Sequence, residues 1–124
     1  MAKKVLVVDD DEEIVEFVEA RLREAGYEVF TAFDGRQGLD QIRAHHPDLV
    51  LLDLAMPVMH GFEVCQAVRA DHAFDDVKIV VTSGKSYAVD IKAAKRLGAD
   101  EYIVKPYDLM QLLEAVGQFL EPAK

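Results

Sequence analysis

The feature that most constrains the fold is a set of five short apolar runs that recur at similar intervals along the chain. They comprise residues 5–8, 27–31, 49–52, 79–81 and 102–104. Most of them are continuous rather than alternating in polarity, which is typical of strands buried on both faces of a parallel sheet. The runs therefore predict five central strands.

Helical patterns fill the intervals between these runs. The first has Glu12 and Glu13 in its first turn and Gly26 just beyond its end, as the helix dipole and a C-terminal glycine favour. Its apolar stripe is expected to comprise Ile14, Phe17, Val18, Leu22 and Ala25. Further stripes lie in residues 39–42, 62–68, 88–97 and 109–119. The chain thus reads as five βα units.

Strict alternation of strands and helices predicts a parallel sheet covered on both faces, and right-handed crossovers leave few topologies. We expect an α/β fold of the flavodoxin-like type, a doubly wound five-stranded parallel sheet of order 2-1-3-4-5 with five helices. With 124 residues, 51% of them hydrophobic, the chain is expected to be a single domain spanning residues 1–124. The ligand crevice of such a sheet lies beyond the carboxyl ends of the first and third strands.

Charge and composition exclude several classes of function. A net charge of -9 argues against binding to nucleic acid, because a phosphate backbone requires a basic surface. The basic start of the chain precedes an apolar run of only residues 5–8, too short for a signal peptide or membrane span. We therefore expect a cytoplasmic protein without membrane insertion. The lone Cys65 cannot form an internal disulfide and is expected to be a packed, reduced thiol.

Polar residues stand at the carboxyl ends of four predicted strands. They are Asp9 and Asp10 after the first, Asp53 at the end of the third, Thr82 and Ser83 after the fourth, and Lys105 with Pro106 after the fifth. Because the ends of parallel strands meet at one edge of a sheet, we expect these side chains to converge on one crevice.

Three carboxylates in one crevice repel one another, so the cluster predicts a hard divalent cation with oxygen ligands, most plausibly Mg²⁺. The ammonium group of Lys105 and the hydroxyl group of Thr82 can then hold an anionic group beside the metal. Asp53 is central and is the best candidate nucleophile, whereas Asp9 and Asp10 form the adjacent pair expected of metal ligands. The arrangement favours phosphoryl transfer to a carboxylate.

Several motifs resemble the receiver-domain family of two-component response regulators, and the resemblance extends nearly end to end. They are Val7-Val8-Asp9-Asp10, Asp53-Leu54-Ala55-Met56-Pro57-Val58-Met59-His60-Gly61, Thr82-Ser83-Gly84, Gly98-Ala99-Asp100 and Tyr102-Ile103-Val104-Lys105-Pro106-Tyr107. Together they are highly specific. The resemblance implies a stand-alone, chemotaxis-type receiver whose output is contact with a protein.

By this resemblance, Asp53 accepts phosphoryl from a phosphohistidine on a sensor histidine kinase or a histidine phosphotransfer protein. The resemblance also implies a site for Mg²⁺ or Mn²⁺. Its ligands would be Asp9 or Asp10, Asp53 and the main-chain carbonyl of Ala55. Lys105 is implied to contact the phosphoryl group. The resemblance therefore implies that the protein is not an enzyme, and that it catalyses only its own phosphorylation and dephosphorylation.

The resemblance also implies a switch. Thr82 is expected to move toward the phosphoryl group, Tyr102 to swing inward, and the peptide bond before Pro106 to be cis. The face formed by the fourth helix, fifth strand and fifth helix then changes its preference for a downstream partner, which the sequence does not identify. Dimerisation linked to phosphorylation is left open.

The sequence departs from the family pattern at two positions that have small residues and at two positions in one loop. Ala55 and Gly84 are smaller than the groups that the family often has there, so we expect little shielding of an acyl phosphate from water. Val58 and His60 replace commoner glycine and aspartate residues. Self-dephosphorylation is accordingly expected not to be unusually slow.

Taken singly, these residues have ordinary explanations. Asp10 or Asp11 can cap a helix, Lys105 can be a solvated lysine, and Tyr102 can be a core ring. The four histidines, His45, His46, His60 and His72, lack the spacing of a metal site and are expected at the surface.

Other functions fit the sequence less well. A phosphate-binding P-loop ending at Gly84-Lys85-Ser86 would need a glycine at Ile79, inside a strand. A flavin-binding electron carrier needs a first loop that attracts phosphate, and residues 9–11 would repel it. A haloacid-dehalogenase phosphatase needs an acid where Ala55 stands. A phosphorylation-independent receiver-like module and a receiver fragment of a longer regulator remain as alternatives.

Overall fold

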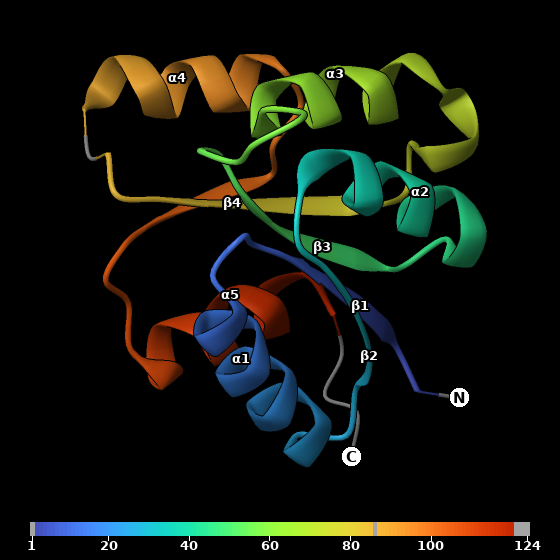
Figure 1. Cartoon of the computed structure of the whole chain (residues 1–124), viewed down its shortest axis with the longest axis vertical. Helices are drawn as coiled ribbons and strands as arrows, with labels where there is room; N and C mark the ends of the chain where they lie inside the picture. The colour runs from blue at the N-terminus through green and yellow to red at the C-terminus, as the bar shows by residue number, and fades with distance from the viewer. Residues whose placement is uncertain (1, 86, 121–124) are drawn as a thin grey trace.

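The sheet has the expected architecture in the computed structural model, which describes residues 2–85 and 87–120. Five parallel strands pair in the order β2-β1-β3-β4-β5 (Figure 1). Their bounds are β1 Lys4–Val8, β2 Glu28–Ala32, β3 Leu49–Asp53, β4 Lys78–Ser83 and β5 Glu101–Val104. The predicted flavodoxin-like fold and its strand order are thus confirmed.

Helices cover both faces of the sheet. Their bounds are α1 Glu12–Glu24, α2 Gly35–His45, α3 Gly61–Ala70, α4 Ala88–Arg96 and α5 Leu109–Phe119, with a short 3-10 helix at His72–Phe74 that the sequence analysis did not anticipate. Figure 1 shows α1 and α5 on one face and α2, α3 and α4 on the other. Each layer buries its own apolar cluster against the strands, which are apolar on both sides. None of the described helices is long and apolar enough to cross a membrane.

The buried face of α1 differs from the predicted stripe. Val15, Val18 and Leu22 are buried, whereas the side chain of Phe17 is 51% exposed. Both sets have helical spacing, so the periodicity alone did not distinguish them. Packing against β1 and β2 selects the set that contains Val15. Phe17 thus belongs to the predicted apolar stripe but not to the buried face of α1.

The three consecutive aspartates at the start of α1 differ in their contacts and in their exposure to solvent. The Asp11 carboxylate accepts hydrogen bonds from the backbone N–H groups of Glu13 and Ile14, at 3.0 and 3.4 Å, and so caps the helix. Asp9 is buried behind it, and Asp10 is exposed. The N-cap is therefore Asp11, and neither Asp9 nor Asp10 caps the helix.

Candidate functional site

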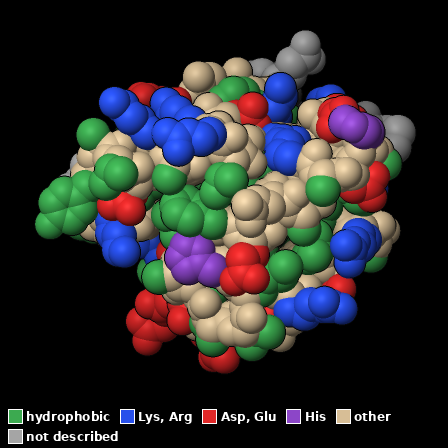
Figure 2. All heavy atoms as spheres, turned by 90° about the horizontal axis from the view of Figure 1, so that it is seen from above, with side chains coloured by type: hydrophobic (Ala, Val, Ile, Leu, Met, Phe, Trp, Pro, Cys, Tyr) green, Lys and Arg blue, Asp and Glu red, His purple; other side chains and the backbone are tan. Residues whose placement is uncertain are grey.

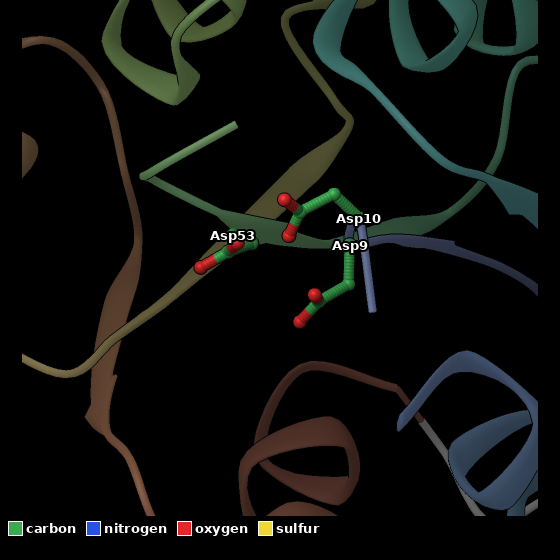
Figure 3. Close-up of side chains that lie close together, drawn as sticks. All are labelled: Asp9, Asp10 and Asp53. Atoms are coloured by element: carbon green, nitrogen blue, oxygen red, sulfur yellow. The ribbon is translucent and has the colours of Figure 1, made fainter. Parts of the chain in front are cut away.

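Three carboxylates meet at the carboxyl ends of β1 and β3. Figure 3 shows the side chains of Asp9, Asp10 and Asp53 lying close together. One oxygen from each lies within 4.8 Å of the other two. Asp53 is the last residue of β3 and Asp9 follows β1, its neighbour in the sheet, so the parallel pairing brings them to one edge.

Lys105 is the cation of this cleft. Its Nζ lies 2.8 Å from Asp9 Oδ2 and 3.2 Å from Asp53 Oδ1. Although burial lowers the pKa of Lys105, its hydrogen bond to Asp9 and the charge of Asp53 outweigh that effect, and the pKa is raised. Lys105 therefore carries its positive charge and links the two buried carboxylates.

Asp53 is an unusual carboxyl group. Its side chain is only 7% exposed. Burial, followed by the negative charge of Asp9, raises its pKa to about 6, although Lys105 opposes the shift. One lysine thus does not balance three carboxylates at neutral pH. The donor atoms of this cluster are all oxygens, which suits a hard divalent cation and not a soft metal.

Thr82 is the register partner of Asp53 on the neighbouring strand. Residues 53 and 82 are paired in the register of β3 and β4, and the backbone N–H of Leu54 donates to the Thr82 carbonyl at 3.1 Å. The residue is 3% exposed. This pairing places Thr82 at the edge of the sheet where the carboxylates meet.

Ser83, which the sequence analysis expected at the same crevice, has a positioning role that was not predicted. Its carbonyl accepts a hydrogen bond of 2.7 Å from the Lys105 backbone N–H, and its hydroxyl oxygen accepts one of 3.1 Å from the backbone N–H of Lys85. It thereby fixes the start of the loop that carries Lys105 and of the loop that follows Thr82. The signal for this role in the sequence was the position of Ser83 directly after Thr82, at the end of a predicted strand.

Tyr102 does not contact the carboxylates. The residue is 9% exposed, and its hydroxyl group donates a hydrogen bond of 2.9 Å to the carbonyl of Lys85 in the loop between β4 and α4. The ring therefore packs inward in this structure. The peptide bond between Lys105 and Pro106 is cis, as the resemblance implies.

A shallow groove opens beside Lys105. It has a volume of about 550 Å³ and is lined mainly by Ile14, Phe17, Val18, Pro106 and Tyr107. The exposed ring of Phe17 forms one wall of this groove. The acidic cleft is thus flanked by an apolar surface between α1 and the loop after β5.

Comparison with known proteins identifies the family. The model of the response regulator receiver domain family matches residues 5–117. The chain belongs to this family. Its fold is therefore that of a receiver domain, a signalling domain of two-component systems.

Solved structures of receiver domains are similar over almost the whole chain. The chemotaxis response regulator CheY4 of Vibrio cholerae is 35% identical, with 97% of this chain and 100% of that chain covered and a TM-score of 0.91. A CheY-like receiver domain protein from Methanospirillum hungatei is 30% identical, with coverage of 95% and 93% and a TM-score of 0.87. CheY in the CheX–CheY–BeF3–Mg²⁺ complex from Borrelia burgdorferi is 26% identical, with coverage of 94% and 87% and a TM-score of 0.87.

The loop between β3 and α3 contains two departures of this receiver domain from the family pattern. His60 Nδ1 accepts a hydrogen bond of 3.1 Å from the Phe62 backbone N–H, and Glu63 accepts one from the His60 backbone N–H, which forms a capping box. His60 thus supplies the N-cap that an aspartate commonly supplies. Val58 has a φ of 69°, a left-handed conformation that glycine adopts more easily, and it is 80% exposed.

Gly61, at the end of this loop, lies close to the end of β3, which carries Asp53. A Cβ atom at Gly61 would lie 2.7 Å from the carbonyl oxygen of Asp53. The loop can therefore fold back over the end of β3 only if this position has no side chain. Ala55 and Gly84 are both exposed, and a Cβ atom at Gly84 would meet nothing within 4 Å. The rim of the cleft is thus open at both positions.

Proposed function

We propose that this receiver domain is a phosphorylation-dependent switch in which Asp53 accepts a phosphoryl group from a phosphohistidine of a sensor histidine kinase or a histidine phosphotransfer protein. The exchange would take place in the cytoplasm. One observation carries the proposal: the buried Asp53 carboxylate, with a pKa raised to about 6, shares the Lys105 ammonium group with Asp9 in an acidic cleft. An acid at the end of a strand has no structural need for this costly environment.

A divalent cation fits the cleft. Asp9, Asp10, Asp53 and the main-chain carbonyl of Ala55 would hold Mg²⁺ or Mn²⁺, and the grouping of three carboxylate oxygens within 4.8 Å supports this assignment. When bound, the ion offsets the negative charge that gathers on the oxygens of a phosphoryl group. The relative from Borrelia burgdorferi is recorded with Mg²⁺ and BeF3.

The residues of the chain would carry out the transfer by position and charge. With a pKa of about 6, Asp53 is mostly ionised at neutral pH, the state that a carboxylate nucleophile needs. A carboxylate oxygen forms the new bond to phosphorus while the bond between phosphorus and the imidazole nitrogen breaks. The electron pair leaves with the imidazole. Lys105 would then turn from the carboxylates to a phosphoryl oxygen, and the Thr82 hydroxyl group would donate to another.

The output would be a change in partner preference at the face of α4, β5 and α5. Thr82 and Tyr102 would link this face to Asp53: Thr82 is paired with Asp53 in the sheet, and Tyr102 bonds to Lys85 in the loop after Thr82. A phosphoryl group that draws Thr82 toward it would therefore alter the loop that leads into α4.

The test is the intact mass of the protein after incubation with Mg²⁺ and acetyl phosphate. The expected result is a single phosphoryl adduct that is lost in Asp53→Asn and in a sample treated with a chelator. Glu16→Gln, which removes an exposed acid of α1, serves as the control and should be labelled as the wild type is. A wild-type protein that binds Mg²⁺ without acquiring the adduct would contradict the proposal and favour a receiver that signals without phosphate.

A further inference from the structure

The loop between β3 and α3 is closed by hydrogen bonds between its two ends. The Leu54 carbonyl accepts one of 3.1 Å from the Met56 backbone N–H and one of 2.9 Å from the Gly61 backbone N–H. Gly61 is the first residue of α3, and a side chain there would collide with the backbone of Asp53 and Leu54. The first turn of α3 therefore rests on the strand end that carries Asp53, and Ala55 lies within the closed loop.

The first turn of α3 is held by an imidazole. The backbone N–H of Phe62 donates to His60 Nδ1 at 3.1 Å, and no other described residue accepts from it. The rings of His60 and Phe62 lie 5.1 Å apart, which keeps the imidazole beside this N–H. Glu63 accepts a hydrogen bond of 3.2 Å from the His60 backbone N–H. Because a helix leaves its first N–H groups without internal partners, the start of α3 depends on the lone pair of Nδ1.

An imidazole cap differs from a carboxylate cap in its response to protons. A neutral imidazole accepts at one ring nitrogen, whereas an imidazolium has two N–H donors and no acceptor. Histidine changes between these forms at pH 5 to 8, where an ordinary carboxylate stays ionised. The cap therefore requires a neutral His60 with its proton on Nε2. An added proton would turn Nδ1 into a donor that faces the Phe62 N–H, and a positive charge at a helix N-terminus is itself unfavourable.

The surroundings of His60 supply no substitute for this acceptor. His60 is half-buried, and Figure 2, which looks onto the layer of α2, α3 and α4, shows histidine side chains at the molecular surface beside acidic ones. The ionisable groups on the elements around it are Glu63 on α3, Asp34, Arg36 and Asp40 at the start of α2, Asp53 on β3, and His72 and Asp75 beyond the far end of α3. The acids would attract an imidazolium and Arg36 would repel it, but exposed charges interact weakly through water. Loss of the direct hydrogen bond therefore decides the effect of protonation.

We propose that His60 makes the loop beside Asp53 respond to pH: the neutral imidazole holds the start of α3 and the loop with it, and the protonated ring releases both. His60 is thus a positioning residue that acts on Asp53 and Ala55 through the bond between Leu54 and Gly61. An aspartate at this position would keep its acceptor throughout the same pH range. The inference rests on the proposed function only for its effect on Mg²⁺ binding and phosphoryl transfer.

Two NMR measurements test the cap. The ¹⁵N chemical shifts of the His60 ring should show an unprotonated Nδ1 at pH 8. Hydrogen exchange of the Phe62 amide is then compared, at each pH, with that in His60→Asn, whose side-chain oxygen accepts at every pH used. The rate in the wild type divided by the rate in the variant should be near one at pH 8 and roughly fivefold higher at pH 5, as expected for loss of one cap.

Asp53 and the other histidines need controls. Burial, followed by the charge of Asp9, raises the pKa of Asp53 to about 6, so both proteins carry Asp53→Asn in the exchange measurement. His72→Asn removes an exposed histidine near the far end of α3 and should leave exchange of the Phe62 amide unchanged. A proton on Nδ1 of the neutral ring, or an exchange ratio that stays constant from pH 8 to pH 5, would overturn the proposal.

Phosphoryl labelling by acetyl phosphate tests the link to the site. With Asp53 intact, the labelling rate of the wild type divided by that of His60→Asn should fall about threefold or more from pH 8 to pH 5, because the released loop no longer holds the site in place. Titration of Asp53 is common to both proteins and cancels in this ratio. A constant ratio would overturn the effect on the site. Failure of both proteins to label at any pH would contradict only the phosphorylation proposal, since the NMR measurements decide the role of the cap.

Discussion

Tyr102 and Lys85 are joined by a hydrogen bond of 2.9 Å from the phenolic hydroxyl group to the main-chain carbonyl. The bond connects β5 to the loop between β4 and α4, and the Tyr102 residue is 9% exposed. The same loop begins at Ser83, whose oxygens bond to the backbones of Lys85 and Lys105. One loop is therefore held both by the strand end that carries Thr82 and by the buried ring of Tyr102.

Tyr102→Phe should lower the free energy of unfolding by about 0.5–1.5 kcal/mol, because the variant keeps the buried ring and loses one hydrogen bond. The measurement is urea denaturation followed by circular dichroism. Tyr107→Phe is the control: among the described residues the Tyr107 hydroxyl group forms no hydrogen bond, so this change should have a smaller effect. Equal losses in the two variants would show that the bond to Lys85 contributes little.

Asp53→Asn should stabilise the metal-free protein at high pH. Burial and the charge of Asp9 raise the folded-state pKa of Asp53 from 3.8 to about 6, so ionisation of this group opposes folding. That cost is absent below the unfolded-state pKa and grows as the pH rises through the folded-state pKa. We expect the variant to gain about 1 to 2 kcal/mol at pH values above 6 and almost nothing at pH values below 4.

Urea denaturation in a chelator across this pH range measures the gain. Glu16→Gln, an exposed acid on α1, should show no comparable dependence on pH. Added Mg²⁺ should reduce the advantage of the Asp53 variant, since the ion would offset the same charges in the wild type. If the difference in unfolding free energy between Asp53→Asn and the wild type does not depend on pH, the surroundings of Asp53 do not raise the pKa of its carboxyl group.

Gly98→Ala should destabilise the fold by about 2 kcal/mol or more. Gly98 has a φ of 107°, and a Cβ atom there would collide with the Arg69 side chain. Arg69 cannot easily move, because its guanidinium group donates to the carbonyls of Gly98, Phe74 and Val77, at 3.0, 3.1 and 2.8 Å. Thermal unfolding measures the loss.

The same substitution at Gly117 is expected to have the opposite effect on stability. Gly117 lies within α5, is exposed, and would place a Cβ atom in open space. Alanine should therefore stabilise the protein by about 0.5–1 kcal/mol through helix propensity. A rise in melting temperature for both variants would contradict the explanation given for Gly98.

Ala55→Arg should lengthen the lifetime of the proposed acyl phosphate by about threefold or more, because a large side chain at the open rim of the cleft would restrict the approach of water. The loss of the phosphoryl adduct after removal of acetyl phosphate measures this lifetime. Ala70→Arg, at the exposed end of α3, adds the same side chain away from the cleft. An unchanged lifetime in Ala55→Arg would refute the role assigned to the small residue.

Much of the fold was predictable because its signals are local. Strands buried on both faces must be apolar along their length, and the five runs predicted the sheet and its order. Parallel strands place their carboxyl ends at one edge, so polar residues after the runs predicted where a site would form. Such inferences need only the alternation of elements and the direction of each strand.

Pairings between distant residues were decided by the tertiary structure. Spacing alone did not tell which of Phe17 and Val15 faces the core, since both have helical spacing and only contact with the sheet selects one. The bond between Tyr102 and Lys85 likewise depends on how β5 lies beside β4.

The chemistry of the site combines both levels. The sequence by itself determined which acids and which lysine stand at the strand ends, because motif and period are local properties. Only the tertiary structure decided that Lys105 reaches both Asp9 and Asp53. Burial and the distances between charges set the pKa of Asp53, and these arise only when segments far apart in the chain pack together.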